Sequence, residues 1–161
     1  MPVIFNLRHL EEKNLHLQAE LSAADLGLQG IDEMIHANGP LSYDLEVQKL
    51  EQSVLVQGRL ELTLDCECVR CLQAYRHPLK LEPWTCHLAL AGEERVAVVN
   101  DCVDLTPYIR EDILLAFPQH PLCRPDCRGL ASIQKKPEKS PGAAQADAPG
   151  STWAALDKLK L

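Results

Sequence analysis

Apolar and polar residues alternate along much of the first half of the chain, which is the pattern of strands with one buried face. The alternation covers residues 15–21 and 43–47, and it is clearest over residues 54–68. In that last stretch the even-numbered positions are mostly apolar and the odd-numbered positions mostly polar. We therefore expect an amphipathic hairpin there, within an antiparallel sheet that has one face in water.

Two shorter strands are expected further along the chain. Residues 84–90 alternate again, and Pro83 directly before them favours an edge position, because proline cannot donate to a neighbouring strand. Val96 and Val98 predict a short strand that ends at Asn100-Asp101.

Residues 104–117 change to the three-and-four spacing of a helix with one buried stripe. Asp104 or Thr106 can cap the first turn, and Pro107 suits that turn because its missing N–H needs no partner there. Pro118 is expected to end the helix. The apolar stripe consists of Leu105, Ile109, Ile113, Ala116 and Phe117.

These patterns predict an α+β fold, in which an antiparallel sheet or partial barrel carries one main packed helix. We expect a single domain over residues 1–130, a flexible linker over 131–150 and a short amphipathic helix over 151–161. The linker is rich in Ala, Pro, Lys, Ser and Gly, so it cannot bury enough apolar surface to order itself. The terminal helix would carry Trp153, Leu156 and Leu159 on one side, and at about three turns it needs another surface to hold it.

The charge balance limits the classes of partner. The 161 residues contain 16 Lys and Arg against 23 Asp and Glu, a net charge of −7, which disfavours nonspecific nucleic-acid binding by a broad basic face. No apolar run approaches the roughly 20 residues of a membrane span, and the N-terminus lacks the pattern of a signal peptide. We therefore expect a cytoplasmic protein with no membrane partner.

The sequence does not carry the motifs of common enzyme classes. It contains no nucleotide-binding loop, no Gly-rich dinucleotide turn and no zinc-protease motif. Its paired carboxylates, Glu11-Glu12 and Glu93-Glu94, stand alone rather than beside other candidate catalytic groups. We therefore expect a protein without catalytic residues.

Seven cysteines in a chain without an export signal favour reduced thiols or metal ligands over disulfides. Two residues separate Cys68 from Cys71 and three separate Cys123 from Cys127, so two short loops can offer four thiolates to one zinc ion. Cys66 and His120 are alternative ligands. The spacing is also compatible with buried thiols that bind nothing, or with a redox-active Cys-x-x-Cys pair.

Basic residues accompany both cysteine pairs. Arg70, Arg76 and Lys80 lie in and after the first pair, and Arg124 and Arg128 accompany the second. If the two pairs meet, these charges meet too and form a local basic patch that can contact RNA or a protein partner. The alternative is a solvated strand face without a partner.

Three motifs follow one another along the chain. The first is Cys68-Val69-Arg70-Cys71-Leu72, the second runs from Val103 to Pro118, and the third runs from Pro121 to Leu130. They resemble, in the same order, the Cys-x-Arg-Cys-Leu signature, the Asp-Leu helix and the Pro-Leu-Cys-x-x-x-Cys-x-Gly-Leu loop of the YceD family, the large ribosomal RNA subunit accumulation proteins. The segment 153–159 is similar to the closing helix of that family.

The resemblance implies a role in the synthesis, processing or stability of the large-subunit (23S) ribosomal RNA. The implied partners are a ribosomal protein, an rRNA-processing factor or the rRNA itself. The family's further Cys-x-x-Cys-Gly run is replaced here by Ala131 and the linker, so only the four cysteines named above carry over. We expect a non-catalytic binding factor, with a zinc-stabilised interaction module or a thiol-redox protein unrelated to rRNA as alternatives.

Overall fold

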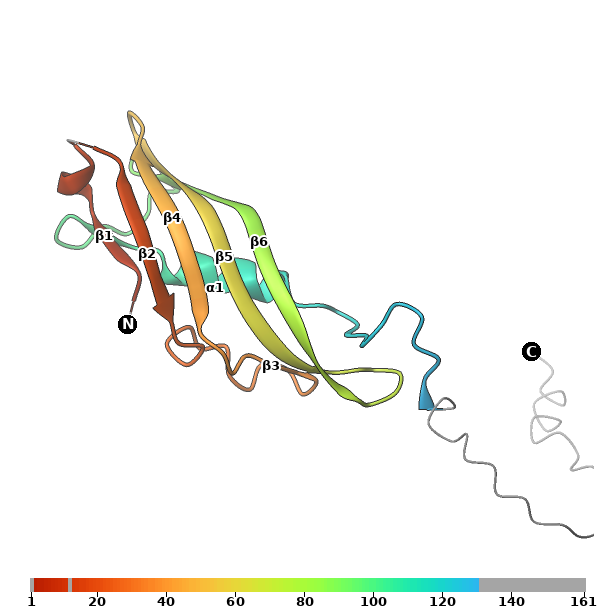
Figure 1. Cartoon of the computed structure of the whole chain (residues 1–161). Helices are drawn as coiled ribbons and strands as arrows, with labels where there is room; N and C mark the ends of the chain where they lie inside the picture. The colour runs from red at the N-terminus through yellow and green to blue at the C-terminus, as the bar shows by residue number, and fades with distance from the viewer. Residues whose placement is uncertain (1, 12, 131–161) are drawn as a thin grey trace, which may run out of the picture.

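A curved antiparallel sheet dominates the computed structural model, which describes residues 2–11 and 13–130 (Figure 1). The strand order is β2-β4-β5-β6, and the short β3 pairs with the far end of β5. The strands are β2 (Leu15–Leu21), β3 (Ile35–His36), β4 (Leu41–Lys49), β5 (Ser53–Glu67) and β6 (Ala74–Ala89).

The stretch expected to form a hairpin is instead one continuous strand, β5, which has β4 on one side and β6 on the other. Gly58, at which a hairpin turn could form, stays within the strand. The even–odd alternation therefore runs through β5 without a turn. At this point β5 passes so close to β4 that a Cβ on Gly58 would collide with the backbone oxygen of Asp44. Glycine is therefore required here for the close approach of two strands.

β6 lies at an edge of the sheet, as Pro83 predicts, but it begins ten residues earlier than the sequence pattern indicates. The pairing shifts along it, because Gly58 lies opposite Trp84 whereas Leu60 lies opposite Leu81. β6 therefore accommodates one extra residue around Pro83. The shift moves the inward-facing positions from odd numbers, such as Leu79, to even numbers.

A small second sheet joins the start of the described chain to the segment directly before α1. β1 (Ile4–Asn6) pairs with β7 (Cys102–Asp104), and a 3₁₀ helix η1 (Leu7–Leu10) follows β1. The strand expected at 96–98 is wrong: a reversal at Asn100 and Asp101, both with positive φ, places the strand after the turn instead.

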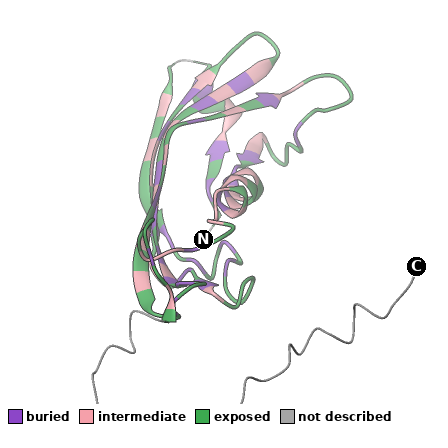
Figure 2. Ribbon diagram, turned by 90° about the vertical axis from the view of Figure 1, so that its right-hand side faces the viewer, coloured by how far each residue is buried: buried purple, intermediate pink, exposed green. Residues whose placement is uncertain are grey.

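Helix α1 (Thr106–Leu115) lies in the concave side of the sheet, as Figure 2 shows. Its buried stripe is the predicted one at Leu105, Ile109 and Ile113, and the helix ends before the predicted limit at 117. The indole N–H of Trp84 donates to Asp112 Oδ2 at 2.7 Å, which ties the helix to β6. The predicted cap at Asp104 or Thr106 is wrong, because the N-cap position falls on Leu105, which has no side-chain acceptor. Asp104 Oδ1 instead accepts from the backbone N–H of Thr106, the first residue of the helix, at 2.8 Å.

The prediction of an α+β fold with a curled sheet and one packed helix is confirmed for the described residues. Their main core joins the inner face of the sheet to α1, the small sheet and the loop before β3. The expected linker over 131–150 and terminal helix over 151–161 lie outside the described residues. Within the described ranges no helix is long and apolar enough to cross a membrane.

Candidate metal centre

The first cysteine pair lies in the turn that joins β5 to β6. The turn closes through the backbone N–H of Cys68, which donates to the carbonyl of Gln73 at 3.0 Å, and through Leu72 N–H, which donates to Cys68 O at 2.8 Å. Leu72 adopts a left-handed conformation with φ 59°, which reverses the chain after Cys71. The long β5–β6 ladder therefore fixes both thiols of this pair at its end.

The second pair lies in the loop after α1. The backbone N–H of Cys127 donates to Arg124 O at 3.1 Å, and the Val69 N–H donates to Pro121 O at 2.9 Å. A side chain adds a second link between the loops, because Arg70 Nη1 donates to Cys127 O at 2.9 Å. Together the two loops, residues 68–73 and 121–128, form the cysteine tip.

The four sulfurs of the cysteine tip form a compact group. Cys68 Sγ lies 3.7 Å from Cys127 Sγ, Cys71 Sγ lies 3.6 Å from Cys123 Sγ, and all four lie within 4.8 Å of one another. Disulfide sulfurs would be about 2.05 Å apart, so none of these thiols is cross-linked. A tetrahedral zinc site with Zn–S bonds of about 2.3 Å needs sulfurs about 3.8 Å apart. The arrangement therefore fits a four-thiolate zinc site.

The surroundings of the sulfurs favour thiolates beside a cation. The backbone N–H of Cys123, helped by those of Cys71 and Arg70, lowers the pKa of the Cys68 thiol to about 6 against the effect of burial. Burial, and then the neighbouring sulfurs, raises the pKa of Cys123 to about 12. Four clustered thiols thus cannot all ionise by themselves, whereas a bound divalent cation deprotonates thiols that coordinate it.

Apolar side chains screen the sulfurs from water. Cys68, Cys71 and Cys127 are buried, and Leu122 and Tyr75 pack against them. Burial raises the pKa of Tyr75 to about 12, so its phenol remains neutral beside the thiols. Tyr75 is not among the site residues predicted from the sequence, and its position follows from the β5–β6 register, in which it pairs with Cys66.

The remaining cysteines lie outside this group. Cys66 packs in the main core, where burial raises the pKa of its thiol, and it lies opposite Tyr75 rather than beside the four sulfurs. Cys86 and Cys102 are half-buried. His120 is exposed in the loop before Cys123 and does not belong to the group of potential ligands found in the described chain.

The five predicted contact residues fall into two settings. Arg70, Arg124 and Arg128 belong to the cysteine tip, where Arg70 is engaged by Cys127 O. Arg124 and Arg128 are exposed, and neither has an ion-pair partner among the described residues. Arg76 and Lys80 lie on β6 instead, 3.7 Å from Asp65 and 3.2 Å from Glu61 respectively.

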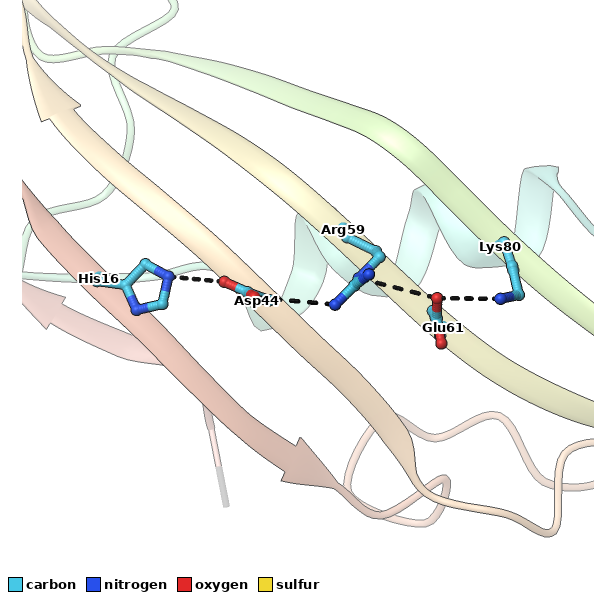
Figure 3. Close-up of polar contacts among 5 residues, drawn as sticks. All are labelled: His16, Asp44, Arg59, Glu61 and Lys80. Atoms are coloured by element: carbon cyan, nitrogen blue, oxygen red, sulfur yellow. Dashed lines mark hydrogen bonds and ion pairs between the residues drawn. The ribbon is translucent and has the colours of Figure 1, made fainter.

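Lys80 belongs to a row of alternating charges across the outer face of the sheet (Figure 3). His16 Nε2 lies 2.7 Å from Asp44, which is 3.9 Å from Arg59, and the Arg59 Nε lies 3.8 Å from Glu61. The charged groups on β4, β5 and β6 thus offset one another, and His16 on β2 contacts Asp44 at the end of the row. This face is solvated and of mixed charge, whereas Arg124 and Arg128, which have no ion-pair partner in the described chain, lie at the cysteine tip.

Most of the chain matches one known protein family. The YceD family, described as large ribosomal RNA subunit accumulation protein YceD, matches residues 56–160. The chain belongs to this family. The match includes most of β5, all of β6 and α1, and all four cysteines of the tip.

Individual relatives come from mycobacteria. An uncharacterized protein of Mycobacterium leprae is 29% identical over 143 residues, which cover 81% of this chain and 65% of that protein. Uncharacterized proteins of Mycobacterium tuberculosis and Mycobacterium bovis are 32% identical over 117 residues, which cover 68% of this chain and 56% of theirs. The chain thus spans less than two thirds of the length of these relatives. No solved structure matches it.

Proposed function

We propose that this protein supports the accumulation of the large-subunit (23S) ribosomal RNA as a non-catalytic, cytoplasmic binding factor. The observation that carries the proposal is the family match over residues 56–160, because the family is described by this role. The match also contains the cysteine tip, the most specific chemical feature of the described chain. Residues 1–130 would form the working domain, joined through 131–150 to the segment 151–161.

In this proposal Cys68, Cys71, Cys123 and Cys127 bind one zinc ion, whose chemistry is to hold thiolates in a fixed tetrahedron. The sulfur distances and the backbone N–H groups that favour the Cys68 thiolate support the assignment. The metal would join the β5–β6 turn to a loop 52 residues further along the chain. It would therefore act structurally, by keeping the two loops of the tip in one arrangement.

The sulfur pairing favours zinc over a redox function. A redox Cys-x-x-Cys motif works through a disulfide within the motif. Here sulfur contacts of 3.7 Å, from Cys68 to Cys127, and 3.6 Å, from Cys71 to Cys123, connect the two loops. A metal ion shared by both loops requires sulfurs of the two loops to lie this close together.

The contact surface in this proposal is the cysteine tip with Arg124 and Arg128, whose charges are free of ion pairs in the described chain, and with Arg70 beside them. Arg76 and Lys80 would contribute at its margin, where Asp65 and Glu61 partly offset their charge. Its partner is the rRNA itself, a ribosomal protein or an rRNA-processing factor. An RNA contact made by so few cations would be weak, and added salt would weaken it further.

The role is tested by deleting the gene and measuring the ratio of large-subunit to small-subunit rRNA during slow growth in the cold. We expect the ratio to fall and the wild-type gene to restore it. A gene encoding Arg124→Ala/Arg128→Ala should fail to restore it, whereas the control Lys13→Ala/Arg95→Ala, which removes two exposed cations elsewhere, should succeed. An unchanged ratio in the deletion strain contradicts the ribosomal role.

The partner class is tested by cross-linking in cells, followed by purification of the protein and analysis of what remains attached. Recovery of 23S rRNA fragments assigns a direct RNA contact, and recovery of a ribosomal protein or processing factor assigns a protein contact. Either should be lost in the Arg124→Ala/Arg128→Ala variant. Recovery of neither, with wild-type protein, contradicts the binding mode.

A further inference from the structure

An apolar groove lies between the loop before β3 and the end of α1. It encloses about 360 Å³, and its apolar lining consists of Ile31, Ile35, Leu114, Leu115, Phe117 and Pro118. Leu115 is 83% exposed and Ile31 is 45% exposed. A leucine this exposed beside a hollow of apolar side chains is typical of a surface that another element covers.

The groove is near the point where the described chain ends. Ile35 pairs with Cys66, and four residues after Cys66 comes Arg70. Four residues span at most about 14 Å. Gly129 packs against Arg70, because a Cβ at Gly129 would lie 3.3 Å from the Arg70 backbone oxygen. The chain therefore leaves the described part at the same end of the molecule as the groove.

We propose that residues 151–161 of the same chain bind in this groove, with Trp153 as the anchor. This segment is the remaining apolar motif of the sequence, with Trp153, Leu156 and Leu159 at helical spacing. The family match continues to residue 160, so the segment belongs to the family's unit. The proposal goes beyond the proposed function and does not depend on a metal.

The connecting chain is long enough for this contact. Residues 131–150 provide twenty residues, which reach roughly 66–72 Å when fully extended. A tethered segment meets its site at an effective concentration of about millimolar for short flexible connections, which favours the chain's own segment over a second copy. The segment carries two lysines, Lys158 and Lys160, against one acidic side chain, Asp157, and Asp32 lines the groove.

Binding would give the terminal segment a surface to pack on and would cover the exposed apolar side chains of the groove. A helix of about three turns is marginal in water unless its apolar side packs on something. A buried tryptophan removes about 150–250 Å² from water, and the groove offers leucine, isoleucine and phenylalanine side chains to receive it. Leu115 and Ile31 would become covered in the same step.

Hydrogen–deuterium exchange on the full chain, read by mass spectrometry, tests the proposal from both sides. In Trp153→Ala we expect amides of residues 28–35 and 112–120 to exchange at least about fivefold faster than in the wild type. In Leu115→Asp we expect the same acceleration within residues 151–161. Because Leu115 is 83% exposed, this substitution leaves the core intact.

The matched controls are Thr152→Ala in the segment and Leu50→Asp at the β4–β5 turn. Neither substitution should change the exchange of the groove amides or of residues 151–161.

Two outcomes overturn the proposal. The first is exchange of residues 151–161 at the rate of an unstructured peptide in the wild type, or groove amides that do not respond to Trp153→Ala. The second is protection that increases with protein concentration, because it would assign the groove to the segment of a second copy. Reciprocal, concentration-independent loss of protection in the two variants supports it.

Discussion

Gly58 lies where β5 passes closest to β4. A Cβ at this position would collide with the backbone oxygen of Asp44, and neither backbone can move without disturbing the ladder. We expect Gly58→Ala to lower the free energy of unfolding by about 1–3 kcal/mol or more, as overpacking does. Urea denaturation of the full chain measures this.

The matched control is Gly39→Ala. A Cβ there would lie 3.6 Å from the Thr63 backbone oxygen, an ordinary contact. Its free energy of unfolding should stay within about 0.5 kcal/mol of the wild type. Equal effects of the two substitutions would contradict the close strand approach at Gly58.

Arg70 has a specific role within the cysteine tip. Its guanidinium donates to the backbone carbonyl of Cys127, which lies in the opposite loop. The sulfur of Cys127 is one of the proposed zinc ligands. Outer partners of this kind typically change metal affinity by roughly 10–100-fold. We expect Arg70→Ala to weaken zinc binding by that factor, measured by competition with a chromophoric chelator. The control is Arg76→Ala, which removes a side chain that is 84% exposed on β6 and should leave the zinc affinity unchanged. An equal loss of affinity in both variants would show that Arg70 acts only through its net charge.

At the scale of elements, α1 is held in the concave side of the sheet by its apolar stripe. Ile113 is fully buried there, and the bond from Trp84 to Asp112 lies one residue away. We expect Ile113→Ala to lower the free energy of unfolding by about 2–5 kcal/mol, measured by thermal or urea denaturation.

Ile4→Ala removes the same atoms from a side chain that is 48% exposed on β1. It should cost clearly less than Ile113→Ala, because less apolar surface returns to water. A similar loss of unfolding free energy in the two variants would contradict the packing of α1 in the core.

The buried faces of elements that follow one periodicity are predicted well from sequence, even where the element itself differs, as in β5, which was expected to be a hairpin. β5 keeps the even positions inward from Val54 to Cys66, and α1 keeps its stripe at Leu105, Ile109 and Ile113. The first half of β6 was missed because its inward positions change parity around Pro83, so no single alternation covers the strand. The strand expected at 96–98 was wrong, because the left-handed turn at Asn100-Asp101 starts the strand rather than ending it.

The candidate site was predictable in its composition and not in its surroundings. Spacing alone identifies the two cysteine pairs, since ligands of one ion must lie on short loops. The contact of Arg70 with Cys127 O and the packing of Tyr75 on the thiols depend on long-range contacts that bring the β5–β6 turn to the loop after α1. No local pattern encodes such contacts.

At the scale of the whole molecule, the cysteine tip connects the end of the sheet to the last described segment of the chain. If zinc holds this connection, its removal should loosen the tip and leave the rest of the sheet in place. We expect a strong chelator to accelerate amide exchange in residues 67–75 and 119–130, whereas β4 and the middle of β5 keep their protection. Uniform acceleration throughout the chain, or none at all, would contradict a local structural role.

The central claim is that four thiolates hold one zinc ion at this tip. Elemental analysis of the full chain, purified without chelator, tests it most directly. We expect about one zinc per chain, lost in Cys68→Ser/Cys127→Ser and retained in the control Cys86→Ser/Cys102→Ser, which changes two half-buried thiols elsewhere. Less than roughly a tenth of an equivalent of zinc in the folded protein would contradict the claim.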